Sequence, residues 1–277
     1  MAILSIQSRV ISGYVGNAAA TPVLQRLGHT VWPIDTVTFS NHPAHGSFRG
    51  SSNPAREVDE LVQGLHERGL FPACDGLLSG YLGTAEAGAA ILNAAALVRD
   101  ASPASLWCCD PVMGDNGTFY VNDDIPEFFR DRAVPTADIV VPNIFEAGYL
   151  AGQAVETHAD AERAAAELLG KGPKTVIITG IKKDKSIGAL LATANGMWLC
   201  MAPVVDIPAS GAGDVFAALY IGHYLKSYDE IEALAQAVTG VHTVLRATAE
   251  VQTIDLQLVA ALPALDNLTT FPVEKIR

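Results

Sequence analysis

Short apolar and β-branched runs alternate with helix-length segments along the chain, and this alternation constrains the fold more than any other feature. We expect strands at residues 2–7, 31–39, 74–79, 106–112, 137–141, 175–180, 188–193 and 197–201. We expect helices between the earlier strands at residues 17–27, 54–68, 84–99 and 160–169, most of them followed by a glycine. Repeats of strand, helix and strand build a mainly parallel sheet with helices on both faces, which is a three-layer α/β/α sandwich.

The last third of the sequence has a different pattern. After residue 201 we expect helices only, at 212–225, 229–245 and 253–262. No linker rich in Pro, Gly or Ser separates this part, so residues 1–277 are predicted to form a single domain. Asn195 and Gly196 stand between two apolar runs, which predicts a hairpin and an antiparallel edge of the sheet.

The charge of the chain excludes several classes of function. Its 277 residues include 18 Lys and Arg against 30 Asp and Glu, a net charge of −12. Such a field repels nucleic acid and anionic lipid, so we expect neither as a partner. The N-terminus has no basic leader, and no run approaches the ~20 apolar residues of a membrane span, which predicts a cytoplasmic protein. The four cysteines form no CxxC pair and are interpreted as structural.

Open α/β sheets bind ligands at the carboxyl ends of their strands. Polar or small residues follow several predicted strands at that edge, namely Ser8, Ser40-Asn41-His42, Ser79-Gly80-Tyr81, Asp110-Pro111, Pro142-Asn143 with Glu146, and Thr179-Gly180.

The strongest local motif is Ser210-Gly211-Ala212-Gly213-Asp214, directly before an apolar helix. Glycines let a ligand approach the backbone, and the helix N-terminus offers free N–H groups, so the motif predicts an anion site. Asp214 fits either a helix cap or a general base. An anion site beside a carboxylate suits phosphoryl transfer to an alcohol. The glycines are misplaced for a dinucleotide fingerprint, and no P-loop is present.

Other charged residues have two interpretations each. Asp110 and Glu146, at neighbouring strand ends, could hold hydrated Mg²⁺ or be turn acids. Lys182, Lys183 and Lys185 could neutralise phosphate or form a solvated face. His42 and His45 have the spacing of metal ligands, but no third ligand lies nearby in the sequence. Residues 113–124 could be a lid over ATP or an ordinary loop.

Taken together, the motifs resemble those of the pyridoxal kinases in the ribokinase-like superfamily. The matching segments cover most of the chain in order: Ser5-Ile6-Gln7-Ser8, Gly13-Tyr14-Val15-Gly16-Asn17, Thr38-Phe39-Ser40-Asn41-His42, Leu78-Ser79-Gly80-Tyr81, Cys109-Asp110-Pro111-Val112-Met113-Gly114, Pro142-Asn143 with Glu146, and Gly211-Ala212-Gly213-Asp214. The last segment alone is weak, because sugar kinases of the superfamily share it.

The resemblance implies an ATP-dependent kinase for the 5′-hydroxymethyl group of pyridoxal, and of pyridoxine and pyridoxamine. It also implies Mg²⁺, in many members K⁺, and a homodimer. By position it assigns these roles: Asp214 as base with Gly211, Ala212 and Gly213 as the anion hole; Ser8, Phe39, Pro43, Ala44 and Tyr81 at the substrate; Asp110, Val141, Asn143, Glu146, Thr179, Ala202 and Val205 at ATP; and Asp110 and Glu146 at Mg²⁺ through water.

Three positions depart from the family pattern. Arg9 replaces the usual His, and Pro43 and Val141 each replace a Thr. The last two changes remove hydroxyls expected at the substrate and at the nucleotide or cation.

Two alternatives stay open. A hydroxymethylpyrimidine kinase shares the fold, but it usually carries a Gly-Ser-Asp-Ser-Gly start and a Cys at the position of Asp214, and both are absent here. The second alternative is a vitamin-binding protein without catalysis, which would not need the anion site formed by Ser210-Gly211-Ala212-Gly213-Asp214.

Overall fold

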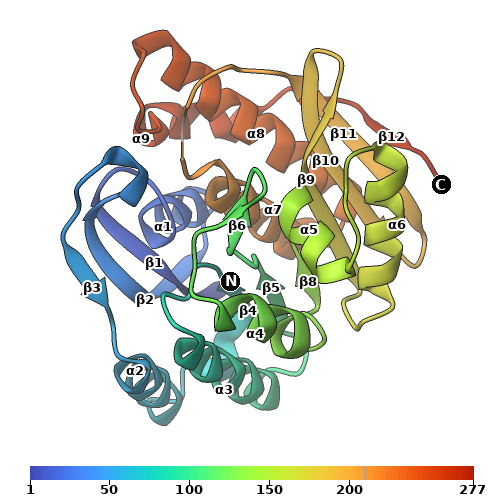
Figure 1. Cartoon of the computed structure of the whole chain (residues 1–277). Coiled ribbons are helices and arrows are strands. Elements are labelled where there is room, and N and C mark those ends of the chain that lie inside the picture. Colours follow the sequence, from blue (N-terminus) through green and yellow to red (C-terminus); the bar gives the residue numbers. More distant parts are fainter. Residues whose placement is uncertain (209) are drawn as a thin grey trace.

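The computed structural model describes residues 1–208 and 210–277, and a ten-stranded mixed sheet runs through the molecule (Figure 1). The strand order is β12-β11-β10-β9-β8-β5-β4-β1-β2-β3. The strands are β1 (Ala2–Ser12), β2 (Thr30–Asn41), β3 (Gly50–Ser52), β4 (Cys74–Ser79), β5 (Leu106–Cys109), β8 (Ile139–Val140), β9 (Thr175–Lys183), β10 (Ser186–Thr193), β11 (Gly196–Pro203) and β12 (Val273–Lys275). The strands from β2 to β9 are parallel, and the antiparallel pairs lie toward both edges.

Helices cover both faces of the sheet, which confirms the three-layer α/β/α sandwich. One face carries α2 (Ala55–Glu67), α3 (Ala85–Ala101), α4 (Asp124–Phe128), α5 (Ile144–Ala151) and α6 (His158–Leu169). The opposite face carries α1 (Asn17–Arg26), α7 (Ala212–Ser227), α8 (Glu230–Val251) and α9 (Leu258–Ala261). Short helical turns lie at η1 (Pro43–His45), η2 (Phe71–Ala73), η3 (Phe129–Ala133) and η4 (Leu262–Asn267).

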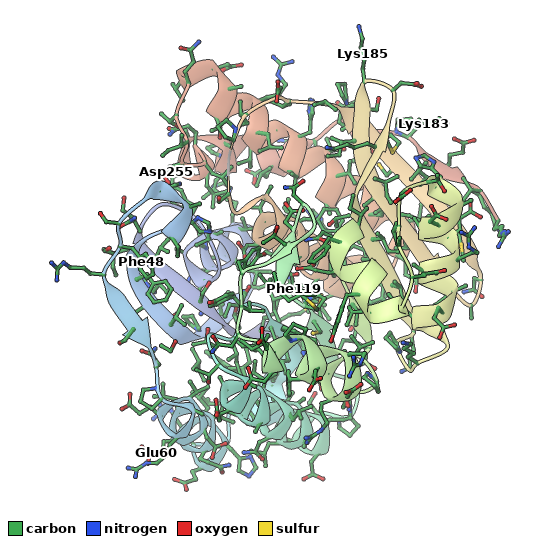
Figure 2. The ribbon with its side chains drawn as sticks, viewed as in Figure 1. Phe48, Glu60, Phe119, Lys183, Lys185 and Asp255 are labelled. Atoms are coloured by element: carbon green, nitrogen blue, oxygen red, sulfur yellow. The ribbon has the colours of Figure 1, made fainter. Side chains whose placement is uncertain are left out.

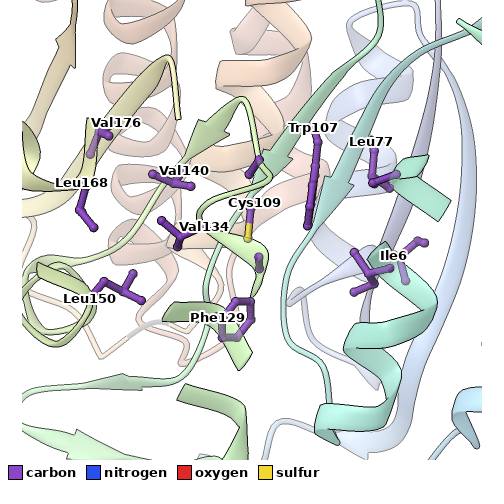
Figure 3. Close-up of a cluster of buried hydrophobic side chains, with 14 of the residues drawn as sticks. Ile6, Leu77, Trp107, Cys109, Phe129, Val134, Val140, Leu150, Leu168 and Val176 are labelled. Carbon is purple, nitrogen blue, oxygen red and sulfur yellow. The ribbon is translucent and has the colours of Figure 1, made fainter. Parts of the chain in front are cut away.

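Two apolar cores lie between these layers, one on each face of the sheet. Figure 3 shows part of the first, where strand side chains such as Leu77 and Val140 pack with Phe129 and Leu168. Each fully buried side chain of this size contributes about 1.5–3 kcal/mol relative to exposure. All four cysteines are buried free thiols in these cores, as their apolar contexts predict. Among the described residues, no helix has the length and hydropathy that crossing a membrane requires.

Several predicted elements are confirmed, and others end differently for identifiable reasons. The strand predicted at 74–79 is β4, and the hairpin at Asn195 joins β10 to β11. The strand predicted at 106–112 ends at Cys109, because Pro111 has no N–H to donate to a neighbouring strand. The strand predicted at 137–141 is shorter, at Ile139–Val140.

The prediction of helices alone after residue 201 is wrong. Strand β12 pairs with the free edge of β11. In the segment predicted as a helix at 253–262, only Leu258–Ala261 is α-helical, followed by the 3-10 turn η4. Side-chain hydroxyls hold the preceding turn instead, since Thr253 Oγ1 donates to the Asp255 carbonyl and Thr248 Oγ1 accepts from the Gln257 N–H.

Residues 113–124 contain a hairpin that the sequence analysis treated only as a lid or loop. Strands β6 (Gly114–Asp115) and β7 (Thr118–Phe119) are joined by Asn116 and Gly117, whose φ angles are 50° and 80°. Asn-Gly favours this two-residue turn. The hairpin therefore stands directly after the end of β5.

Candidate active site

The predicted site residues gather at the carboxyl edge of the parallel strands and at the N-terminus of α7. Asp110 follows β5, Asn143 and Glu146 follow β8, and Thr179 lies in β9. The Thr179 N–H donates to the Pro142 carbonyl at 2.9 Å, and Thr179 and Asn143 form a parallel bridge. The sheet therefore brings together residues that lie as far apart in the sequence as Asp110 and Thr179.

The N-terminus of α7 has the backbone geometry that the predicted anion site requires. Gly211 is the N-cap with φ 96°, and a Cβ there would stand 2.0 Å from the Tyr14 carbonyl oxygen. No side chain caps this helix. Within residues 1–208 and 210–277, no backbone hydrogen bond engages the N–H groups of Ala212 and Gly213, and the helix dipole favours a negative charge there.

Asp214 lies in the first turn of α7 but is not its N-cap. Its carboxylate accepts from the backbone N–H groups of Gly16 and of Asp214 itself. Burial raises the pKa of Asp214 to about 6, and these two N–H groups oppose the rise. A carboxyl group with this pKa is ionised at neutral pH and can still accept a proton, which suits a general base.

Glu146 is buried and held by the backbone. Its Oε1 accepts from the N–H groups of Met113 and Gly114 at 2.9 and 3.4 Å, and its Oε2 accepts from the Asn143 N–H at 2.9 Å. Asn143 reciprocates as the N-cap of α5, in a capping box. Burial raises the pKa of Glu146 to about 8, against the effect of these N–H groups.

Asp110 is also buried, and it faces other acids. Burial first, and then the charges of Glu146 and Asp214, raise the pKa of Asp110 well above its usual value. Like charges this close and this buried are costly unless a cation neutralises them. Carboxylate oxygens are the ligands that Mg²⁺ prefers. The acids of this edge therefore fit a divalent cation.

The arrangement of Asp110 and Glu146 fits a cation that keeps part of its water shell. No group of three or more His, Cys, Asp or Glu side chains in the described part of the chain could hold a metal ion by itself. Mg²⁺ keeps several waters and is usually bound by one or two carboxylates together with phosphate oxygens. Asp110 and Glu146 match that pattern.

Tyr120 lies near the candidate site, and the sequence analysis did not single it out. It is 55% exposed. Desolvation of its phenol and the charges of Glu146, Asp110 and Asp214 raise the pKa of Tyr120, so its hydroxyl lies close to these carboxylates. The Tyr120 N–H donates to the Met113 carbonyl at the base of the hairpin. The sequence feature that could have identified Tyr120 is its position shortly after the turn at Asn116 and Gly117.

The predicted substrate residues occupy β1, β2 and the segments that follow β2 and β4. Ser8 is buried beside Gly16, where a Cβ would stand 2.4 Å from the Ser8 hydroxyl. Phe39 packs on Phe48 with ring centroids 4.8 Å apart. Tyr81 is half-buried and its carbonyl accepts from Thr36 Oγ1. The two remaining residues, Pro43 and Ala44, are exposed in η1.

The predicted nucleotide residues divide into two groups. Asn143 and Thr179 lie at the edge beside the acids. Val141 and Ala202 are buried in the core on the α7 face, and Val205 is half-buried. Only the backbones of Val141 and Ala202 could therefore meet a ligand.

Two cavities lie elsewhere. One of about 470 Å³ lies between α8 and residues 264–271, and one of about 380 Å³ adjoins Arg9, Tyr14 and Asp255. No predicted site residue lines either of them. The candidate active site is thus identified by its chemistry and not by a cavity.

Comparisons with known proteins match the chain to a phosphomethylpyrimidine kinase family model and to individual pyridoxal kinases. The family model described as phosphomethylpyrimidine kinase matches residues 74–258. Pyridoxal kinase PdxY of Rubrobacter xylanophilus is 45% identical over 99% of this chain and 97% of its own length. Pyridoxal kinase PdxY of Deinococcus radiodurans is 44% identical over 94% of this chain and 91% of its own length. The solved pyridoxal kinase of Leishmania donovani, in complex with ADP and pyridoxamine, superposes with a TM-score of 0.94 at 28% identity, over 100% of this chain and 99% of that one.

Proposed function

The chain belongs to the pyridoxal kinase family, and from this we propose that it transfers the γ-phosphate of ATP to the 5′-hydroxymethyl group of pyridoxal. Pyridoxine and pyridoxamine are further substrates, and the reaction serves vitamin B6 salvage. The observation that carries the proposal is the partly buried Asp214 carboxylate beside the uncapped N-terminus of α7. The carboxylate can accept a proton and the helix N-terminus can stabilise negative charge, and phosphoryl transfer to an alcohol needs both.

In the proposed reaction, the Asp214 carboxylate takes the proton of the substrate hydroxyl. The hydroxyl oxygen then forms a bond to the γ-phosphorus, the bond to the β-phosphate oxygen breaks, and ADP leaves. The backbone N–H groups at Gly211, Ala212 and Gly213 stabilise the charge that develops on the transferred group.

Asp110 and Glu146 hold the nucleotide's Mg²⁺ through its waters. When bound, this ion neutralises phosphate charge and orients the phosphate chain. The buried acids of this edge support the assignment, because burial raises the pKa values of both and the charges of Glu146 and Asp214 raise that of Asp110 further, so a bound cation would stabilise their ionised forms. K⁺ is a candidate second cation.

Ser8 binds the pyridine ring, Phe39 and Tyr81 are its aromatic walls, and Pro43 and Ala44 close the site as the family pattern implies. At the nucleotide we propose side-chain contacts from Asn143 and Thr179 and backbone contacts from Val141, Ala202 and Val205. The position of Asn143 and Thr179 next to Glu146 supports this arrangement.

We also infer a cytoplasmic homodimer whose residues 1–277 form a single kinase domain. The continuous sheet from β3 to β12 supports the single domain, since its two edges come from opposite ends of the chain.

A hydroxymethylpyrimidine kinase is the second candidate, because the matching family model carries a phosphomethylpyrimidine kinase description. An assay that couples ADP release to a colour change, run with pyridoxal, hydroxymethylpyrimidine and ribose, separates the candidates. We expect ADP release with pyridoxal at least tenfold faster than with either other substrate. A preference for hydroxymethylpyrimidine would reverse the assignment, and tight pyridoxal binding without ADP release would indicate a binding protein.

A further inference from the structure

The hairpin between β9 and β10 carries a concentrated positive charge. Three of the chain's seven lysines, Lys182, Lys183 and Lys185, lie within four residues at its tip, and all three are exposed. Asp184, with φ 53°, makes the turn between them. Figure 2 shows Lys183 and Lys185 projecting from the end of this hairpin into solvent.

Among the residues that the structure describes, these lysines differ from the other four in having no side-chain partner. The other four are engaged as follows: Lys171 Nζ donates to the Leu150 carbonyl, Lys226 Nζ donates to the Leu27 carbonyl, Lys174 Nζ lies 3.5 Å from Asp138, and Lys275 Nζ lies over the ring of Trp198. No ion pair or side-chain hydrogen bond within residues 1–208 and 210–277 engages the ammonium groups of the hairpin tip. Their charges are thus free to act on a ligand.

The hairpin continues the strand that borders the candidate active site. Thr179 pairs with Asn143 beside Glu146, and β9 then runs on to Lys183. At ~3.3 Å per residue the Lys183 backbone stands at most ~13 Å beyond Thr179. That distance exceeds the Debye length of about 8–10 Å at physiological salt and lies within the longer Debye length of dilute buffer, so the charges at the tip act at the site most strongly at low ionic strength.

The same hairpin also adjoins the segment proposed to contact ATP. The Lys185 carbonyl accepts from the Val204 N–H at 2.9 Å, and Ser186 pairs with Pro203. Val204 lies between Ala202 and Val205 in that segment. The lysines therefore stand at the nucleotide side of the site and not at the substrate side.

A local positive charge at the hairpin tip would counter the repulsion between this acidic chain and an anionic nucleotide. The chain carries a net charge of −12, and the site adds the acids Asp110, Glu146 and Asp214. Mg-ATP is itself an anion, so the overall field slows its approach. A patch whose charge is opposite to that of the ligand raises association rates by about 10- to 1,000-fold, so a local positive patch can offset this repulsion.

We propose that Lys182, Lys183 and Lys185 form a capture site for the phosphate chain of an incoming nucleoside triphosphate, which they guide into the site without taking part in the chemistry. This inference rests on the proposed function, because it takes ATP as the phosphate donor.

The test compares two double variants that remove equal charge. Lys183→Gln with Lys185→Gln alters the tip, and Lys174→Gln with Lys275→Gln is the control. Lys174 precedes β9 at the opposite end of that strand, and Lys275 lies on the edge strand β12. Initial rates are measured at about 20 mM and about 500 mM ionic strength.

At low ionic strength we expect the tip variant to lose ~3- to 10-fold in kcat/KM for Mg-ATP, with kcat and the KM for pyridoxal within twofold of wild type. At high ionic strength the loss should disappear, because salt screens exposed charges. The control pair should stay within twofold throughout. Equal losses in both pairs, no loss in the tip variant, or a loss that persists at high salt would each overturn the proposal.

A binding measurement separates this inference from the proposed function. Stopped-flow association of a fluorescent ADP analogue and of the matching adenosine analogue needs no phosphoryl acceptor. If the wild-type protein phosphorylates no pyridoxal, the proposed function fails, while slower ADP association in the tip variant with unchanged adenosine association still supports capture. Equal ADP association in wild type and tip variant refutes capture whatever the acceptor is.

Discussion

Gly211 and Tyr14 meet so closely that a Cβ on Gly211 would stand 2.0 Å from the Tyr14 carbonyl oxygen. The β1–α1 connection thus packs against the start of α7, and the same connection supplies the Gly16 N–H to Asp214. Two backbone segments from opposite ends of the chain fix the proposed base and anion hole relative to each other.

Replacing Gly211 with Ala should therefore separate these segments. The backbone of one of them must move, and the φ of 96° adds about 1–3 kcal/mol of strain in a non-Gly residue. We expect kcat to fall at least ~100-fold, the scale of losing anion-hole donors, with secondary structure by circular dichroism retained. Gly28→Ala is the matched control, since Gly28 has φ 87° but no atom near its Cβ position. Similar kcat values in the two variants would contradict the role of the Tyr14 contact.

Asp214→Asn tests the general base. The amide keeps the shape of the side chain but cannot take a proton, so kcat should fall ~10²- to 10⁴-fold while ADP affinity holds. Because burial raises the pKa of Asp214 to about 6, the wild-type kcat should rise with pH through about 6 and then level off. The Asn variant should lack that step. More than half of the wild-type kcat, or an unchanged acid limb, would remove Asp214 from the chemistry.

The fold and the site were predictable to different extents. Strand β4 and the β10–β11 hairpin follow from local patterns, because burial and turn chemistry specify them within a few residues. Strand β12 exists only because β11 offers a free edge far away in sequence, and no local pattern encodes that pairing. Likewise Asp214 follows from its glycine motif, whereas the position of Tyr120 among the acids depends on how the β6–β7 hairpin packs.

The acid cluster predicts how stability depends on pH and Mg²⁺. The folded pKa of Glu146 is raised to about 8, and that of Asp110 also lies above its unfolded value. The folded protein thus binds these protons more tightly, so the contribution of these two acids to stability is complete below about pH 4 and is lost as pH rises toward 8. We expect the Tm of the Mg²⁺-free protein to fall between pH 5 and about 8, and Mg-ADP to raise it at pH 8.

Asp110→Asn should reduce both the fall of Tm with pH and the rise of Tm with Mg-ADP, because it removes one of the like charges. It should also raise the Mg²⁺ concentration needed for half-maximal activity. Asp123→Asn, at an exposed position before α4, is the control and should leave the Tm slope and the Mg²⁺ requirement unchanged. Identical Mg²⁺ titrations and Tm profiles for wild type and Asp110→Asn would show that Asp110 is an acidic residue of a turn with no role in Mg²⁺ binding.

We predict that the β6–β7 hairpin acts as a lid. Phe119 at its end packs on Phe145 and Tyr149, with ring centroids 4.9 and 5.3 Å apart, and Glu146 accepts from the Gly114 N–H at its base. The hairpin is thus anchored to α5 at its base while its tip at Asn116 and Gly117 is exposed. A kinase that leaves its γ-phosphate open to water hydrolyses ATP, so a cover over the phosphates would favour transfer.

We expect Mg-ATP with a non-phosphorylatable pyridoxal analogue to slow amide hydrogen exchange across residues 114–121. Exchange at the β10–β11 turn around Asn195, which has the same Asn-Gly chemistry but lies away from the acids, serves as the internal control. A variant in which Asp115 to Thr118 is replaced by a shorter Gly-Gly turn should hydrolyse more ATP for each pyridoxal phosphorylated, because water then reaches the γ-phosphate. If the ligands slow exchange equally at both turns and the shortened variant keeps the wild-type ratio of transfer to hydrolysis, the hairpin is an ordinary surface loop.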